Sequence, residues 1–439
     1  MLKRDIYRTL LEWKNEERRQ PLLLRGARQI GKTYLIEQFG KNEFENFVDI
    51  NFERRPELKD IFTSFDPVEL IKKIKFITGK EIKAGRTLLF FDEVQSCPKA
   101  IVSLRYFYEE MPDLHVIAAG SLLEFALTRA NISIPVGRIQ YLFMYPLSFK
   151  EFMFALGNEP LYEYLYNSPA VPNIDPVIHN MLIQNVRDYY LLGGMPKVVD
   201  EYIRSGDVIK CEKIQSSILD TYSDDFKKYA PEEDIMHLKT VFHSIPSMVG
   251  RKYVYSKVDP EKRSADLKRA VQLLEMAGVV TRVKRTSASA MPLEAGVKHS
   301  YFKLLFLDIG LLHSISGLYP KTMMVSDLNT IYMGGVSEQF VGQELLAYGD
   351  PFHRDSLYYW LRESRNSSAE IDYLIQRGGN VYPIEVKSGS TGRMKSMALF
   401  MEQFKSEKGF KVSQSPYLEG KITEIPFYLI EKLFLEPSD

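Results

Sequence analysis

Short apolar runs separated by helical patterns fill the first third of the chain. Residues 21–24 are apolar and the run stops before Gly26, as a buried parallel strand would. Similar runs lie at 47–52, 87–91 and 114–119, and the segments between them are long enough for helices. Strands that alternate with helices predict an α/β domain with a parallel sheet.

The pattern changes three times along the rest of the chain. After about residue 146 it becomes helical and rich in aromatic residues. Helical stretches followed by two β-rich runs, 279–285 and 301–307, then give the order of a winged helix. The last segment opens with a helical pattern and continues as strand, Gly-Gly turn and strand over 372–386. These changes predict an α/β domain, a helical lid region, a winged-helix-like segment and a C-terminal α/β domain over residues 1–145, 146–229, 230–325 and 326–439.

The composition is that of an ordinary globular protein. The 439 residues are 45% hydrophobic, and 57 Lys and Arg residues balance 57 Asp and Glu residues, so the formal net charge is zero. The hydrophobic content excludes a largely disordered chain, and the charge balance excludes a global positive field that would attract nucleic acid. Residues 251–303, however, hold twelve Lys or Arg against five Asp or Glu. A DNA-binding surface is therefore expected in that segment.

Cysteine content and the apolar runs indicate where the protein works. The two cysteines, Cys97 and Cys211, are too few for a disulfide scaffold and lack metal-ligand spacing. No stretch reaches the ~18 uninterrupted apolar residues of a membrane span, and residues 1–20 alternate charged with apolar residues, unlike a signal peptide. We therefore expect a cytoplasmic protein with no membrane partner.

Residues 26–33 fit the phosphate-binding pattern G-x-x-x-x-G-K-[ST], follow an apolar strand and precede a helical pattern. In such a loop the backbone N–H groups surround phosphate oxygens, the lysine reaches the β- and γ-phosphates, and the hydroxyl binds Mg²⁺. A glycine-rich turn without a ligand is the alternative. The predicted ligands are ATP and Mg²⁺, and the predicted binding residues are Gly26, Ala27, Arg28, Gln29, Ile30, Gly31, Lys32 and Thr33.

Two carboxylates follow the apolar run 87–91. Asp92 stands at the end of a buried strand beside the phosphate loop, where Mg²⁺ is held in such proteins, so it is the second expected metal contact after Thr33. Glu93 points to the other face, where a carboxylate can orient and polarise the attacking water. An exposed acidic strand end is the alternative. The pair predicts ATP hydrolysis, with Lys32 and Glu93 as catalytic residues.

At these residues the chain resembles the AAA+ ATPases, within the phosphate-loop class that places an extra strand between the nucleotide loop and the Asp-Glu strand. Residues 47–52 are expected to be that strand. Ser121 resembles the polar sensor of the family, which implies a contact with the γ-phosphate or water, whereas a helix N-cap is the alternative. Arg138 resembles the arginine that such ATPases present to a neighbour's nucleotide, which implies a homo-oligomer. A surface salt bridge is the alternative for Arg138.

A second set of charged residues lies near the C-terminus. Glu385 and Lys387 share one face of a predicted strand, and Asp372 lies on the partner strand across a Gly-Gly turn. Two carboxylates can hold a divalent cation while a lysine polarises water, which fits metal-dependent phosphodiester hydrolysis. The set resembles the PD-(D/E)xK nuclease signature, with Glu338 matching the acidic residue on the first helix of that fold. The alternative is a strand face whose charges pair with one another.

The whole layout resembles a large family of prokaryotic ATPases that join an AAA+-like domain to a C-terminal domain of restriction-endonuclease-like fold. The resemblance implies an ATP-hydrolysing enzyme that acts on or with DNA through a winged helix and a nuclease-like domain. The alternative is a nucleotide-dependent switch or scaffold that binds a protein partner and cuts nothing. Affinity for duplex DNA that depends on salt would favour the first interpretation.

Overall fold

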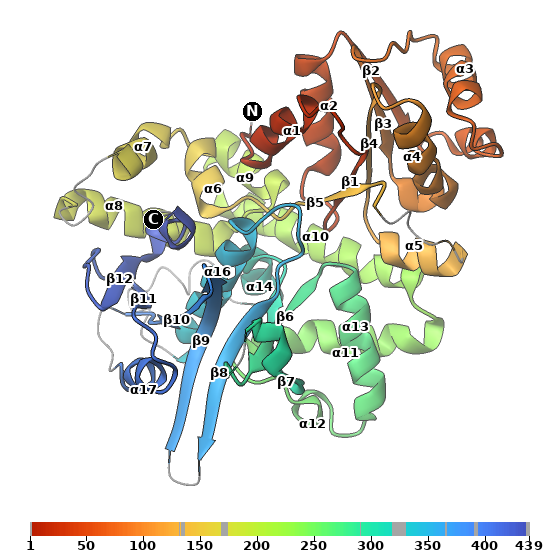
Figure 1. Ribbon diagram of the computed structural model, residues 1–439. Coiled ribbons are helices and arrows are strands. Elements are labelled where there is room, and N and C mark those ends of the chain that lie inside the picture. The colour runs from red at the N-terminus through yellow and green to blue at the C-terminus, as the bar shows by residue number, and fades with distance from the viewer. Residues whose placement is uncertain are drawn as a thin grey trace.

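Two sheets organise the chain in a computed structural model. Figure 1 shows a sheet in the first third of the chain, a second sheet in the C-terminal half, and the helical middle segment between them. The structure describes residues 2–130, 132, 137–167, 174–289, 291–317, 331–364, 367–389 and 394–435.

The first sheet has five strands in the order β2-β3-β4-β1-β5. Every neighbouring pair in it is parallel, which confirms the predicted parallel α/β core. In a parallel sheet all carboxyl ends of the strands lie at one edge, so the residues that follow them meet there. The strands are β1 (Leu22–Arg25), β2 (Asn46–Asn51), β3 (Thr87–Asp92), β4 (His115–Gly120) and β5 (Gln140–Phe143).

The strand between β1 and β3 is β4, so the prediction that residues 47–52 fill this place is wrong. Burial gives the reason. All six residues of β4 are buried, as a central strand covered on both faces requires, whereas β2 leaves Asp49 exposed and lies at the edge of the sheet. The inserted strand is therefore the one that leads to Ser121.

Helices cover both faces of this sheet. Leu22 and Leu24 belong to the core that also holds apolar residues of the first two helices, whereas Leu23 belongs to the core formed with the next two. Because successive side chains of a strand point to opposite faces, a fully apolar strand such as β1 is what a sheet covered on both faces needs. These helices are α1 (Ile6–Lys14), α2 (Lys32–Glu43), α3 (Pro67–Thr78), α4 (Pro98–Glu110) and α5 (Leu123–Ala130).

The middle segment is helical, as its pattern predicts. Ser148 and Glu151 form a capping box at the first of its helices, and Asp175 caps a later one through the backbone N–H of Val177. In the described part of the chain, none of the helices is both long and apolar enough to cross a membrane. The middle helices are α6 (Phe149–Ala155), α7 (Glu159–Asn167), α8 (Pro176–Leu192), α9 (Pro196–Ser205) and α10 (Val208–Tyr229).

The next segment has the predicted order of helices and then a hairpin, but the hairpin is not a free wing. Strand β6 pairs antiparallel with β7 on one side and parallel with β8 of the C-terminal part on the other. The hairpin is thus one edge of a larger sheet. The elements are α11 (Glu232–Met248), α12 (Tyr255–Val258), α13 (Ser264–Met276), β6 (Val280–Thr286) and β7 (Val297–Phe306).

The second sheet has seven strands in the order β12-β11-β10-β9-β8-β6-β7. Its β9 and β10 form the predicted hairpin, and both turn glycines, Gly378 and Gly379, have positive φ. Figure 1 shows β8 and β9 projecting together from the body of the protein. The remaining elements are α14 (Ile309–Ile315), α16 (Ile331–Ala347), β8 (Leu357–Ser364), β9 (Ser367–Arg377), β10 (Asn380–Val386), α17 (Lys395–Phe404), β11 (Gly409–Ser413), β12 (Ile422–Pro426) and α18 (Lys432–Leu435).

One large core joins the middle helices to the C-terminal half. The rings of Phe149, Tyr189 and Phe340 contact one another edge to face, with centroids 5.7–6.2 Å apart. Phe149 begins α6, Tyr189 lies on α8 and Phe340 lies on α16. Aromatic rings bury large apolar areas, so these elements pack as one body although they are far apart in the sequence.

Candidate nucleotide-binding site

The phosphate loop joins β1 to α2 at the carboxyl edge of the parallel sheet. Gly26 has a φ of +153°, and a Cβ atom there would lie 2.4 Å from the backbone oxygen of Met144. Gly31 has a φ of +93° and is the N-cap residue of α2. Glycine adopts both conformations without strain. The two glycines therefore shape a turn that leaves the N-terminal N–H groups of α2 open to an anion.

Lys32 folds over this turn. Its Nζ donates to the backbone oxygens of Gly26, at 3.0 Å, and of Ala27, at 2.6 Å. Burial lowers the pKa of Lys32 to about 8, although the carboxylates of Glu93 and Asp92 oppose the shift. At neutral pH the ammonium is mostly charged, and both of these oxygens are neutral partners. Its charge is thus available to phosphate oxygens.

Asp92 ends β3 beside the first turn of α2. The Thr33 hydroxyl donates to Asp92 Oδ2 at 3.0 Å, and Asn51 at the end of β2 donates its side-chain amide to the same oxygen at 2.8 Å. Burial, and then the charge of Glu93, raise the pKa of Asp92 to about 6. A hydroxyl and a carboxylate in contact at a phosphate loop fit the oxygen ligands that Mg²⁺ takes. The contact of Asn51 with Asp92 was not predicted from the sequence.

Glu93 turns away from the strand in a left-handed conformation, with a φ of +53°. Its Oε2 accepts a hydrogen bond from the Gln95 side chain at 2.5 Å, and its charge acts on Lys32 across the loop. A non-glycine residue held at positive φ is strained, and such strain is often found at functional sites. The structure thus brings Glu93 to the phosphate loop together with Asp92.

Ser121, at the end of β4, also reaches the loop, but through Arg28. The Arg28 Nε atom donates to Ser121 Oγ at 3.2 Å. One Nη of Arg28 forms an ion pair with Asp225 of α10 at 2.6 Å, and the Tyr222 hydroxyl donates to the backbone oxygen of Arg28 at 2.6 Å. The phosphate loop is therefore tied to the middle helices by its own third residue. Asp225 was not a predicted site residue.

Arg138 lies at the other end of the same sheet. It precedes β5, which runs parallel to β1, so it stands at the amino edge while the phosphate loop stands at the carboxyl edge. Its Nε forms an ion pair with Glu109 at 2.9 Å, and 45% of its side chain is exposed. Arg138 is therefore remote from the loop of its own chain. Its role toward a neighbouring chain stays a prediction.

A cavity of about 780 Å³ opens beside the N-terminus of α2. Gly31 of the phosphate loop lines it, and Tyr34, one helical turn further on, is 48% exposed there. Pockets of this size commonly hold small organic ligands. Other residues that line it are Arg4, Tyr7, Leu11, Leu35, Gln38 and Pro196.

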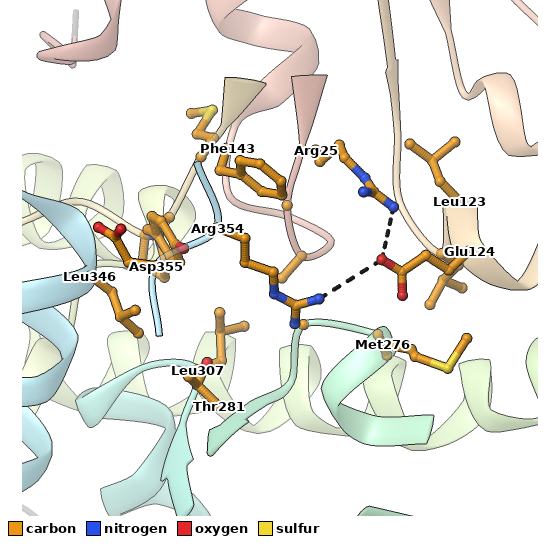
Figure 2. Close-up of a pocket in the computed structure, with 18 of the residues that line it drawn as sticks. Arg25, Leu123, Glu124, Phe143, Met276, Thr281, Leu307, Leu346, Arg354 and Asp355 are labelled. Atoms are coloured by element: carbon orange, nitrogen blue, oxygen red, sulfur yellow. Dashed lines mark hydrogen bonds and ion pairs between the residues drawn. The ribbon is translucent and has the colours of Figure 1, made fainter. Parts of the chain in front are cut away.

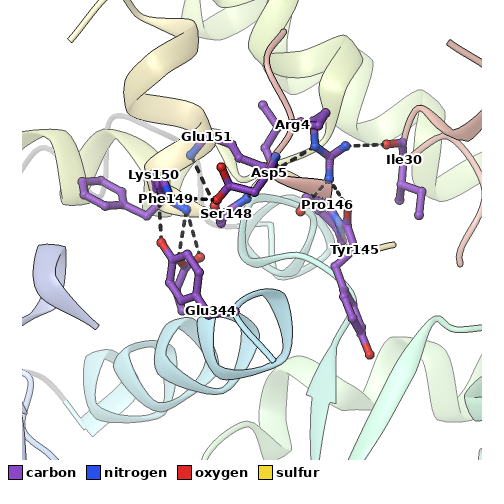
Figure 3. Close-up of polar contacts among 12 residues, drawn as sticks. Arg4, Asp5, Ile30, Tyr145, Pro146, Ser148, Phe149, Lys150, Glu151 and Glu344 are labelled. Atoms are coloured by element: carbon purple, nitrogen blue, oxygen red, sulfur yellow. Dashed lines mark hydrogen bonds and ion pairs between the residues drawn. The ribbon is translucent and has the colours of Figure 1, made fainter. Parts of the chain in front are cut away.

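Arg4 binds the N-terminal segment to the phosphate loop. It donates to the backbone oxygens of Ile30, at 3.0 Å, and of Tyr145, at 2.7 Å, and it pairs with the carboxylate of Glu151 at 3.0 Å (Figure 3). The side chains of Arg4 and Glu151 are both less than one-tenth exposed. A charged residue near the start of a chain gives no sequence signal for such a contact.

A second cavity, of about 90 Å³, separates the carboxyl edge of the parallel sheet from the C-terminal half. Figure 2 shows Glu124 of α5 between two arginines, Arg25 at the end of β1 and Arg354 of the C-terminal half. The distances are 2.9 Å and 3.8 Å. Nearby, a Cβ atom on Gly278, between α13 and β6, would lie 3.5 Å from the backbone nitrogen of Ala27 in the phosphate loop. The segment that carries the β6–β7 hairpin thus comes close to the loop.

In the second sheet, Glu338 and Asp372 come together as predicted, but around a lysine. Lys303 Nζ lies 2.8 Å from Glu338, 2.5 Å from Glu370 and 3.6 Å from Asp372. Lys303 is the single cation inside the apolar run 301–307. This position was a signal of a buried lysine, and it was not used in the prediction from the sequence. The sequence expectation of a metal at these carboxylates is not matched by a ligand set, since no three His, Cys, Asp or Glu side chains of the described residues are placed so that they could hold a metal ion.

Glu385 and Lys387 share a strand face, as predicted, and pair with each other. Their Oε1 and Nζ atoms are 2.5 Å apart. Asp372 Oδ2 accepts a hydrogen bond from the backbone N–H of Val386 at 2.8 Å, which brings β9 and β10 together at this point. Glu385 Oε2 is buried and accepts no hydrogen bond from a described residue. The carboxylates of this sheet therefore have lysines as their cationic partners.

The cations of the β6 hairpin do not form an open basic surface, contrary to expectation. Arg282 pairs with Glu275 at 3.3 Å, and Lys284 pairs with Glu294 at 2.9 Å. Arg285 is buried and donates to the backbone oxygen of Leu361 at 2.9 Å. The reason is that β6 is an inner strand between β7 and β8. Exposed cations of this segment lie on or next to its helices, at Lys257 of α12, Lys268 of α13 and Arg263 just before α13, and on β7 at Lys298.

Three family models match successive parts of the chain. Residues 18–153 match an AAA domain. Residues 183–322 match a domain of unknown function (DUF8612), and residues 333–427 match another (DUF4143). The first part of the chain is thus similar to an AAA domain, and no match identifies the C-terminal half as a nuclease.

Solved structures match at low similarity. The Orc1 protein of Aeropyrum pernix in complex with DNA is 14% identical, with 71% of this chain and 90% of that chain covered and a TM-score of 0.28. The RuvB Holliday junction branch migration motor of Thermotoga maritima is 18% identical, with 64% and 90% covered and a TM-score of 0.28. Drosophila ORC bound to DNA is 14% identical, with 71% and 85% covered and a TM-score of 0.25. These scores are too low to carry an argument. No curated protein matches the chain.

Proposed function

We propose that the AAA domain of this chain binds ATP with Mg²⁺ and hydrolyses it. The observation that carries the proposal is the contact of 3.0 Å between Thr33 and Asp92 at the N-terminus of α2. A hydroxyl and a carboxylate held together beside a phosphate loop form the protein part of a Mg²⁺ site. When bound, Mg²⁺ would neutralise charge on the β- and γ-phosphates.

The neighbouring residues have separate roles in this proposal. Lys32 exchanges its carbonyl partners for phosphate oxygens and keeps its positive charge close to them. Glu93 accepts a proton from the attacking water, while Gln95 fixes one oxygen of its carboxylate. Ser121 contacts the γ-phosphate or this water. The nucleoside lies in the cavity beside Gly31.

We also propose that nucleotide state is transmitted to the C-terminal half through Arg28. This residue belongs to the phosphate loop, contacts Ser121 at 3.2 Å and pairs with Asp225 of α10 at 2.6 Å. A γ-phosphate beside Ser121 would compete with Asp225 for the guanidinium, since phosphate is a strong partner of arginine. The ion pair to α10 would then weaken, and α10 would be free to move.

A nucleotide-dependent switch is the function that the second sheet supports best. Its carboxylates pair with Lys303 and Lys387, which leaves them less available to the metal that cleavage of phosphodiesters requires. Arg138 is exposed at the amino edge of the parallel sheet, and in this proposal it contacts the nucleotide bound to a second copy of the chain. A homo-oligomer is therefore part of the proposal.

Binding to DNA is the second candidate, and one observation favours it. Arg263 and Lys268, at the start of α13 and on its first turns, are exposed, and neither forms an ion pair within the described part of the chain. Cations that face solvent are those that neutralise phosphates when duplex DNA binds. The helical face of this segment, and not its hairpin, is the surface to test.

Turnover by the purified full chain tests the proposal. We expect ATP hydrolysis with Mg²⁺ that stops when the metal is chelated. ATP binding without hydrolysis would support a nucleotide-binding scaffold instead. Failure to bind ATP, with or without metal, would contradict the proposed function as a whole.

A further inference from the structure

Lys303 occupies the centre of the carboxylates in the second sheet. We propose that its ammonium is the permanent cation of the cluster formed by Glu338, Glu370 and Asp372, which therefore binds no divalent metal in the native protein and acquires a metal site when Lys303 is removed. This inference concerns the C-terminal half alone, and it holds whether or not the AAA domain hydrolyses ATP.

The cluster draws its members from three elements. Lys303 is on β7, Glu338 is on α16, and both Glu370 and Asp372 are on β9. The ammonium lies 2.8 Å from the carboxylate of Glu338, 2.5 Å from that of Glu370 and 3.6 Å from that of Asp372. A lysine has three N–H donors, so three acidic neighbours are as many as it can serve at once.

The surroundings hold the ammonium in place. The Lys303 side chain is 4% exposed, and its Nζ lies 5.4 Å from the centre of the Tyr359 ring. A lone buried charge is very unfavourable, but a buried charge with acidic partners and an aromatic face is well satisfied. A metal ion at this position would have to displace the ammonium and leave it without partners. That displacement disfavours metal binding strongly.

The other carboxylates of the face do not offer a metal site either. Glu385 pairs with Lys387, and one oxygen of Asp372 already accepts the backbone N–H of Val386. Only Glu385 Oε2 is buried there without a hydrogen-bond partner among the described residues. Mg²⁺ takes about six oxygen ligands and is usually bound through one or two carboxylates, with waters and substrate phosphates completing the set. One carboxylate oxygen beside a lysine is too small a set.

An internal cation has a structural consequence. Through Lys303, the β6–β7 hairpin is joined to α16 and β9 without an ion that could dissociate. The edge strand β7 and the central strand β9 of the second sheet then stay together at any metal concentration. A nuclease site built on these carboxylates would need the opposite arrangement, in which they stay open to a metal and its bound water.

The test is manganese binding to the full chain without nucleotide. Every protein carries Asp92→Asn, so that the phosphate loop contributes no carboxylate. Free Mn²⁺ is followed by electron paramagnetic resonance, and melting temperature is followed by circular dichroism. For the Lys303→Gln variant we expect melting roughly 5–10 °C below the parent, binding of a single Mn²⁺ ion, and recovery of most of the lost melting temperature with Mn²⁺. The parent should bind none.

Lys411→Gln is the matched control. Lys411 is also buried in the second sheet, 7% exposed, and pairs with Glu424 at 2.9 Å. Its loss should lower the melting temperature without recovery by Mn²⁺. If Lys303→Gln does not fold alone, Mn²⁺ during refolding should restore folded protein. The proposal is overturned if the parent binds Mn²⁺ in a way that Asp372→Asn removes, or if Lys303→Gln gains neither binding nor refolding with Mn²⁺.

Discussion

The two sheets each place lysines and carboxylates side by side, but they pair them differently. In the phosphate loop, Lys32 bonds to two backbone carbonyls, and Asp92 bonds to a hydroxyl and an amide. In the second sheet, Lys303 bonds directly to carboxylates, as does Lys387. Charges with neutral partners remain available to a ligand, whereas charges paired with each other are already satisfied.

This difference means that residue types at the right spacing do not by themselves make an active site. A motif identifies charges, but their availability depends on what the rest of the fold brings to them. For the phosphate loop the partners are local in sequence or come from neighbouring strand ends. For the second sheet the decisive partner, Lys303, comes from a strand about seventy residues before Asp372.

Lys32→Ala should have the largest effect. The substitution removes the ammonium that lies at the backbone oxygens of Gly26 and Ala27 and that would stabilise the phosphate charge. ATP hydrolysis should therefore fall by about 10²–10³-fold or more, and ATP affinity should drop. Steady-state hydrolysis and calorimetry measure both. Lys41→Ala, on the exposed side of the same helix and paired with Glu37, is the control and should change neither. Unchanged turnover in Lys32→Ala would remove the phosphate loop from the mechanism.

Glu93→Gln should slow hydrolysis by about 10²–10⁴-fold while ATP stays bound, because an amide keeps the shape of the side chain but cannot accept the proton. Single-turnover hydrolysis and calorimetry on the same preparation separate the two quantities. Equal turnover in the variant and the parent would assign activation of water to another group.

Asp92→Asn should stabilise the protein above about pH 6. The folded chain keeps the Asp92 proton up to a pKa of about 6, whereas the unfolded chain loses it near the ordinary value of 3.8. The free energy of unfolding therefore falls as pH rises from about 4 to about 6. The variant has no carboxyl group to ionise there, so at pH 7.5 its free energy of unfolding should exceed that of the parent by up to about 3 kcal/mol. Urea denaturation across pH measures it. The gain should vanish near pH 4, and the exposed Asp49→Asn control should show none.

The Arg28–Asp225 pair should carry a coupling energy of about 1–3 kcal/mol without nucleotide, and less with a non-hydrolysable ATP analogue. A double-mutant cycle with Arg28→Met and Asp225→Asn, read by urea denaturation, gives this value. The exposed Arg204–Asp200 pair on α9 is the control, with a coupling of about 0.5 kcal/mol or less. A coupling that nucleotide leaves unchanged would exclude this pair as the route to α10.

The smallest effect concerns DNA. If duplex DNA binds, Arg263→Ala with Lys268→Ala should lower the slope of log affinity against log salt by about 1.8, because each phosphate contact contributes about 0.9. Arg282→Ala with Lys284→Ala should leave the slope unchanged, since these cations already pair with Glu275 and Glu294. The reverse result would return the DNA surface to the hairpin.

Local features were predictable from the sequence, and distant pairings were not. The phosphate loop, Asp92 and the parallel sheet follow from short patterns of apolar and glycine residues, because neighbours in sequence determine them. The strand order of that sheet was predicted wrongly, with residues 47–52 in the place of β4, because apolar runs of similar length do not reveal which strand is central. Full burial of β4 does.

The C-terminal half shows the same limit more strongly. The β9–β10 hairpin and the shared face of Glu385 and Lys387 follow from alternation along a strand. The pairing of β6 with β8, and with it the position of Lys303, depends on contacts across a long stretch of chain. These contacts decide that β6 is an inner strand of the sheet and that the carboxylates face an ammonium.

Manganese counting on the full native chain, with and without an ATP analogue, tests the contrast between the two sheets most directly. We predict one bound Mn²⁺ per chain in the presence of the analogue, lost in Lys32→Ala, and none in its absence. A Mn²⁺ ion bound without nucleotide and lost in Asp372→Asn, or no Mn²⁺ bound with the analogue, would contradict the assignment of an open site to the first sheet and a closed one to the second.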